Sequence, residues 1–126
     1  MDAGVYDITL SPRGSYRRHF EFIEDDGVTP VDFTGCEARM EIRPRPESAT
    51  LYISINEVPT ADGDITLGGS AGTIDIFITA EATDTLANVR GAYWDLFVEY
   101  PNGEDVVKFM KGKVKIDASV TEPSHD

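Results

Sequence analysis

The residues from 36 to 43 alternate strictly between apolar and charged side chains. The apolar positions hold Cys36, Ala38, Met40 and Ile42, and the four positions between and after them hold glutamate or arginine. Successive side chains of an extended strand point to opposite sides, so this segment is predicted to be a strand with one buried and one solvated face. Two prolines, Pro44 and Pro46, end it.

Shorter patterns of the same kind recur along the chain, separated by turn-forming residues. They predict strands over residues 5–10, 16–24, 51–55, 73–79, 92–100, 105–110 and 113–117, with a further short strand at 65–67. Only residues 80–88 have helical spacing, with Thr79 placed to cap the helix N-terminus. The pattern predicts an all-β fold, a single antiparallel β-sandwich (Ig-like) of seven to eight strands with one short helix. A small barrel is the alternative.

The length of 126 residues matches one domain. We expect a sandwich domain over residues 1–117 and a flexible polar C-terminal tail over 118–126. Neither a membrane-spanning apolar run nor a signal peptide is visible. We therefore expect the protein to be synthesised in the cytoplasm and not to associate with a membrane. The single cysteine, Cys36, lies on an apolar strand face and is predicted to be a buried hydrophobic residue rather than a reactive thiol.

The net charge of −12 is unevenly distributed. Six of the seven arginines precede Pro46, all four lysines lie within residues 108–115, and residues 47–105 hold eleven acids and one base. Such a surface repels phosphate, which disfavours nucleic acid as a partner. Two interpretations of the pattern stay open. Either the charges only solvate the surface, or the arginine-rich first third docks on an acidic neighbour while the acidic middle faces solvent.

No motif in the sequence predicts a catalytic or metal site. His19 falls on the charged face of a predicted strand, His125 lies in the tail, and no serine has a nucleophile motif. One cysteine and two distant histidines do not make a zinc site. The acidic glycine turns at 25–27 and 62–64 contain calcium-like ligands, but they lack EF-hand spacing and are typical of hairpins. We therefore expect neither enzymatic activity nor a metal or cofactor.

The order of several motifs resembles a family of small bacteriophage and prophage structural proteins, similar to the N-terminal module of phage baseplate upper proteins. The resemblance spans residues 5–117. It rests on an aromatic strand at 20–22, Asp-Phe-Thr-Gly at 32–35, Met-x-Ile-Arg at 40–43, Gly-x-Tyr-x-Asp-Leu at 91–96, Pro-x-Gly at 101–103 and Gly-Lys-Val at 112–114. Members have no known catalytic residues, so the resemblance implies a building block that works by protein–protein contacts.

The resemblance implies a non-enzymatic virion protein, assembled in the host cytoplasm, in the tail, baseplate or tail-fibre attachment region. Its partners would be other virion proteins, with several copies in a symmetric assembly or a homo-oligomer. A capsid decoration or head–tail collar protein is one alternative, and a carbohydrate-binding sandwich with exposed aromatic rings is another. Aromatic residues and arginine dominate binding hot spots. The candidate interface residues are therefore Arg13, Arg17, Arg18, Tyr93 and Phe97.

Overall fold

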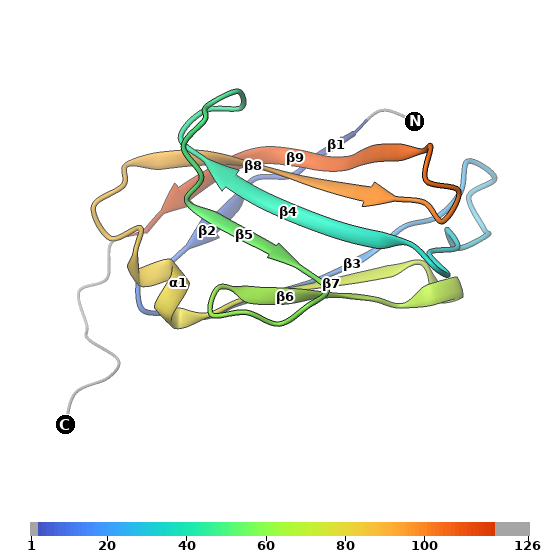
Figure 1. Ribbon diagram of the computed structural model, residues 1–126, viewed down its shortest axis with the longest axis horizontal. Coiled ribbons are helices and arrows are strands. Elements are labelled where there is room, and N and C mark those ends of the chain that lie inside the picture. The colour runs from blue at the N-terminus through green and yellow to red at the C-terminus, as the bar shows by residue number, and fades with distance from the viewer. Residues whose placement is uncertain (1–2, 118–126) are drawn as a thin grey trace.

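The computed structural model describes residues 3–117, so the predicted tail at 118–126 lies outside the described residues. Two β-sheets pack face to face, with helix α1 (Ala80–Asp84) at one end of the sandwich (Figure 1). The sandwich prediction is confirmed. One sheet has the order β1-β9-β8-β4-β5, with β2 also paired to β9, and its strands are β1 (Gly4–Val5), β2 (Ile8–Leu10), β4 (Glu37–Arg43), β5 (Ile53–Asn56), β8 (Gly91–Glu99) and β9 (Val106–Ile116). The other sheet has the order β3-β7-β6, with β3 (Tyr16–Glu21), β6 (Gly63–Leu67) and β7 (Thr73–Ile78).

The core lies between the sheets and is built from the inward residues of alternating strands. On β4 and just before it, Cys36, Ala38, Met40 and Ile42 are at most 6% exposed, which confirms the predicted buried face and the buried cysteine. The inward residues of β7, Ile74, Ile76 and Ile78, are buried as well. The strand predicted over residues 51–55 begins later, because β5 starts only at Ile53 and Leu51 is 43% exposed.

The two ends of the chain depart from the predicted strands. The segment predicted as one strand over residues 5–10 forms β1 and β2, which both pair in parallel with β9 and are separated at Tyr6 and Asp7. The strands predicted over 105–110 and 113–117 are both present, but the predicted break between them is wrong, because β9 is a single strand in which Gly112 pairs with Trp94. All other strand pairs are antiparallel.

A β-bulge interrupts the pairing of β8 with β9. Leu96 pairs with Met110 and Phe97 with Lys108, which leaves Phe109 as the extra residue. Phe109 points into the core, where its ring centroid lies 5.3 Å from that of Phe22 and 5.4 Å from that of Phe33. The bulge thus allows two consecutive residues of β9, Phe109 and Met110, to be buried together.

Helix α1 begins where the sequence predicted. The hydroxyl of Thr79 accepts a hydrogen bond from the backbone N–H of Ala82 at 3.1 Å, which is the N-cap geometry. Thr83 is fully buried and donates to the carbonyl of Gly14 at 2.8 Å, fixing the turn between β2 and β3 against the helix. Over residues 3–117, no helix combines the length and hydrophobicity needed to cross a membrane.

Candidate interaction surface

The outer face of the six-stranded sheet carries the outward residues of β4, β8 and β9, and we call it the basic face. Because side chains alternate along a strand, burying Met40 and Leu96 turns their neighbours outward. Neighbouring strands place these outward residues side by side: Arg43 pairs with Tyr93, and Arg39 with Phe97. The outward set is Glu37, Arg39, Glu41 and Arg43 on β4, Tyr93, Asp95, Phe97 and Glu99 on β8, and Val106, Lys108, Lys111, Lys113 and Lys115 on β9.

All four lysines of the chain lie on this face. Lys111, Lys113 and Lys115 occupy alternate positions opposite Asp95, Tyr93 and Gly91, and the bulge brings Lys108 to the same side, opposite Phe97. With the two arginines of β4, the face holds six of the 11 basic residues of the protein. A chain with net charge −12 therefore concentrates its cations on one surface.

Several of these charges interact within the face. The guanidinium of Arg43 lies 2.8 Å from the carboxylate of Glu41 and donates to the carbonyl of Ser48 at 3.0 Å. The ammonium of Lys108 lies 3.8 Å from the carboxylate of Asp95. Lys111, Lys113 and Lys115 form no ion pair with any other residue in the range 3–117.

The environment of Asp95 raises the pKa of its carboxyl group. Burial is the largest cause, the charge of Lys108 partly opposes it, and the nearby charge of Glu41 adds to it. The ring of Phe97 lies close to two cations, with the Lys108 ammonium 5.4 Å and the Arg39 guanidinium 5.9 Å from its centroid. The centre of the basic face is therefore an aromatic ring between cations, beside a carboxylate with a raised pKa.

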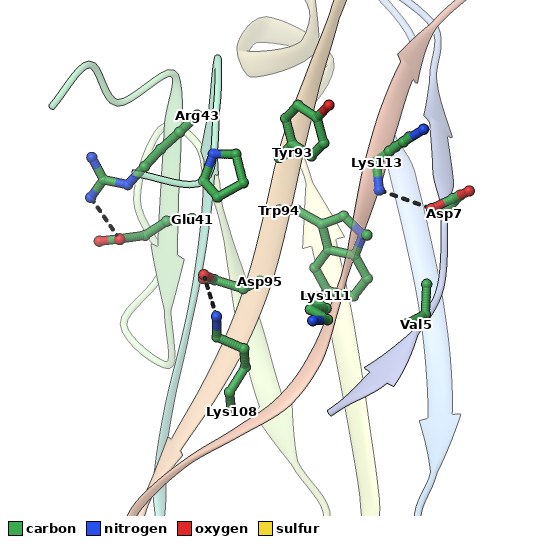
Figure 2. A pocket seen from close by; sticks show the side chains of 12 residues that line it. Val5, Asp7, Glu41, Arg43, Tyr93, Trp94, Asp95, Lys108, Lys111 and Lys113 are labelled. Atoms are coloured by element: carbon green, nitrogen blue, oxygen red, sulfur yellow. Dashed lines mark hydrogen bonds and ion pairs between the residues drawn. The ribbon is translucent and has the colours of Figure 1, made fainter. Parts of the chain in front are cut away.

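A hollow of about 300 Å³ opens on the basic face (Figure 2). Tyr93 and Val5 lie on two sides of it, with the indole of Trp94 between them. The remaining lining consists of Pro46 from the loop after β4, Gly112 of β9 and a rim of charged side chains, namely Asp7, Glu41, Arg43, Asp95, Lys108, Lys111 and Lys113. The hollow is thus an apolar depression bordered by four basic and three acidic side chains.

The bend between β1 and β2 holds one wall of this hollow in place. The indole N–H of Trp94 donates to the carbonyl of Tyr6 at 2.7 Å, and the N–H of Tyr6 donates to the carbonyl of Lys111 at 2.9 Å. The carboxylate of Asp7 accepts from the backbone N–H of Lys113 at 2.9 Å, so a side chain continues the pairing where the strand is broken. These bonds fix Val5 beside Lys111.

A second hollow, of about 220 Å³, lies at the other end of the same face beside Phe97. It is lined in part by Val58 and Val106, which are both exposed. Of the seven large hydrophobic residues that are exposed within residues 3–117, four line these two hollows: Val5, Val58, Tyr93 and Val106. Exposed apolar groups therefore gather on the basic face rather than being spread over the surface.

Two of the five interface residues predicted from the sequence, Tyr93 and Phe97, lie together on this face. The sequence did not predict Val5, Asp7 or Pro46 as neighbours of Tyr93. Their approach depends on the parallel pairing of β1 with β9 and on the course of the loop after β4, and no short-range pattern encodes either.

The three predicted arginines lie elsewhere and apart from one another. Arg13 lies in the turn after β2, with its Nε 3.6 Å from a carboxylate oxygen of Asp84. Arg17 lies on the outer face of the three-stranded sheet, its guanidinium 4.0 Å from the ring centroid of Phe77. Arg18 is on the other side of β3, 4.9 Å from the ring centroid of Tyr6. They form no common surface with the aromatics, and their role in an interface stays a prediction.

The potentially reactive or metal-binding side chains lie apart from one another. His19 pairs with Asp75 at 2.6 Å on the exposed face of the three-stranded sheet. Burial raises the pKa of the Cys36 thiol, which keeps it protonated and unreactive. Within the described part of the chain, no group of three or more His, Cys, Asp or Glu residues is arranged to hold a metal ion.

Comparison with known proteins identifies the domain. No curated protein sequence matches the chain. A protein-family model described as an LtfC-like, β-sandwich domain matches residues 2–117, which is nearly the whole chain. The two-sheet sandwich observed over the same residues agrees with that description. The chain belongs to the family of LtfC-like β-sandwich domains.

Proposed function

We propose that this protein is a non-enzymatic structural component of a bacteriophage virion, an adaptor in the tail, baseplate or tail-fibre attachment region that acts through protein–protein contacts. The observation that carries the proposal is the family match over residues 2–117, because the family is associated with phage tails and is structural rather than catalytic.

The surface supports a role in protein contacts. The basic face combines exposed apolar residues, aromatic rings and cations, which is the composition of interface hot spots. Tyr93 lies at a hollow that can receive a side chain of a partner. In a symmetric particle, many copies of the adaptor would present this face at once.

The carbohydrate-binding alternative needs an open aromatic platform. Tyr52 is partly buried against the core, and the ring of Phe97 lies between Lys108 and Arg39. Of the rings of Tyr52, Tyr93 and Phe97, only that of Tyr93 belongs to an exposed residue, and it lies beside a hollow. We therefore favour a protein partner, and binding to a glycan array would argue against that choice.

The proposal is tested by locating the protein in purified particles. We expect mass spectrometry to detect it in the virion and immunogold labelling to place it on the tail or its fibres. Labelling of the head or collar would replace the tail role by capsid decoration or a collar role. Absence from particles would overturn the virion role altogether.

A further inference from the structure

We propose that the basic face binds an extended acidic segment of another virion protein. Carboxylates of that segment would pair with Lys111, Lys113 and Lys115, and one of its apolar side chains would enter the hollow between Val5 and Tyr93. The inference rests on the proposed function, because it names the chemistry of the partner that such an adaptor holds.

The charge distribution is the first argument. The outward charged residues of β4, β8 and β9 are six basic and four acidic, so the basic face carries +2 and the rest of the chain −14. Two of the four acids, Glu41 and Asp95, already lie close to Arg43 and Lys108. Outside these two ion pairs the face holds Arg39, Lys111, Lys113 and Lys115 against Glu37 and Glu99, with Asp7 at the rim of the hollow. The surplus of positive charge therefore lies along Lys111, Lys113 and Lys115, and a partner of opposite sign matches it.

The spacing of the lysines is the second argument. Lys111, Lys113 and Lys115 occupy every second position of β9, so their Cα atoms are about 7 Å apart. This spacing is shorter than the Debye length of about 8 Å at physiological ionic strength, so the three charges act on a ligand together. An extended segment with acidic residues at every second position repeats at the same interval. An α-helix does not, because its neighbouring turns are about 5.4 Å apart.

The hollow is the third argument. Its volume of about 300 Å³ is at the lower end of ligand pockets, and its apolar walls suit one hydrophobic side chain rather than a large molecule. Val5, at 72% exposure, remains open to solvent although it borders this depression. A buried apolar anchor surrounded by a polar rim is the usual arrangement of a protein–protein interface.

The same features disfavour nucleic acid. A phosphate backbone at Lys111 would approach the carboxylates of Asp95 and Glu41 on the same face. A protein segment can place its carboxylates on the lysines and its apolar groups over the hollow.

The first test measures incorporation into particles. A phage lacking the gene is supplied with wild-type protein, with K111E/K113E, with K111R/K113R or with R45E/R90E. K111E/K113E and R45E/R90E have the same net charge, but only K111E/K113E reverses the charge of the β9 lysines. We expect incorporation of K111E/K113E to fall at least about tenfold, while K111R/K113R and R45E/R90E incorporate like wild type. Circular dichroism and thermal unfolding of each variant are the checks that it is folded.

The outcomes separate the two proposals. If wild-type protein is absent from particles, both the virion role and this inference are overturned. If wild type and K111E/K113E are incorporated equally, the virion role stands and this inference fails. Equal loss in K111E/K113E and R45E/R90E would also overturn it, because the effect would then follow net charge rather than the basic face.

The second test identifies the partner. The photo-crosslinker p-benzoylphenylalanine replaces Tyr93 or, as a matched control on the opposite sheet, Phe77. We expect the Tyr93 variant alone to crosslink, within assembled particles, to a segment of another virion protein with Asp or Glu at alternate positions. A crosslink to a second copy of this chain, to nucleic acid or to a non-acidic segment would overturn the inference, as would equal crosslinking from Phe77.

Discussion

Replacing Gly112 by alanine tests the packing that holds β1 beside the basic face. A Cβ atom at Gly112 would lie 2.0 Å from the carbonyl oxygen of Tyr6 and 2.9 Å from the indole nitrogen of Trp94. These two atoms are the acceptor and donor of the 2.7 Å hydrogen bond that fixes the bend between β1 and β2. Real Cβ atoms do not approach backbone so closely, so the bend must move away from β9.

The expected cost follows from the two interactions that alanine disturbs. Overpacking typically costs about 1–3 kcal/mol, and loss of the Trp94 hydrogen bond adds roughly 0.5–1.5 kcal/mol. We therefore expect Gly112→Ala to lower the free energy of unfolding by about 1.5–4.5 kcal/mol. For a domain of this size, that corresponds to a fall in Tm of roughly 5–20 °C.

The assay is urea and thermal unfolding followed by the fluorescence of Trp94, which is the single tryptophan of the chain. Gly91→Ala is the matched control, because Gly91 lies in the neighbouring strand and its Cβ would meet only the carbonyl of Val114 at 3.6 Å, an ordinary contact. We expect that control to change stability by no more than about 1 kcal/mol. Equal stability of the two variants, with unchanged Trp94 emission in native Gly112→Ala, would refute the reasoning.

Three further predictions follow from single residues. Thr79→Ala removes the cap on Ala82 and should destabilise the protein by about 0.5–2 kcal/mol in urea unfolding, whereas Thr79→Ser should retain most of the stability. Cys36 should react with a thiol reagent only after denaturant unfolds the chain, and rapid reaction of native protein would contradict its burial. Burial raises the pKa of Asp95, so native protein takes up this proton before the unfolded chain as pH falls. The ionised carboxylate therefore lowers the free energy of unfolding at a pH above its native pKa. Below the ordinary value of 3.8 the carboxyl group is protonated in both the native and the unfolded state, and this loss of stability disappears. Asp95→Asn should be more stable than wild type at pH 7, by a margin that shrinks in thermal unfolding as the solution is acidified, and a constant margin would contradict the prediction.

The sequence predicts the fold well where a strand has one wet and one dry face. β4 shows this: every second residue is buried, and the alternation alone identifies both its faces. The cap at Thr79 was also predictable, because it is a local interaction within one turn of helix. Such features depend on neighbours in the chain, which the sequence lists directly.

The basic face was only partly predictable, because its assembly depends on long-range pairing. Lys108 and Lys111 are three positions apart, so simple alternation would place them on opposite sides of β9, and only the bulge at Phe109 brings them together. Tyr93 was identified as outward-facing, but its proximity to Val5 requires the parallel pairing of β1 with β9. A bulge and a parallel register both arise from packing between distant segments.

The grouping of Lys111, Lys113 and Lys115 is not explained by folding. These lysines form no ion pair within residues 3–117, and exposed ion pairs would contribute little stability even if they were present. Mutual repulsion among three cations at alternate positions disfavours the strand slightly. An anionic group that approaches from outside would relieve this repulsion, and the adjacent hollow has room for an apolar side chain beside that group. The arrangement therefore makes sense as half of an interface, whose other half is acidic.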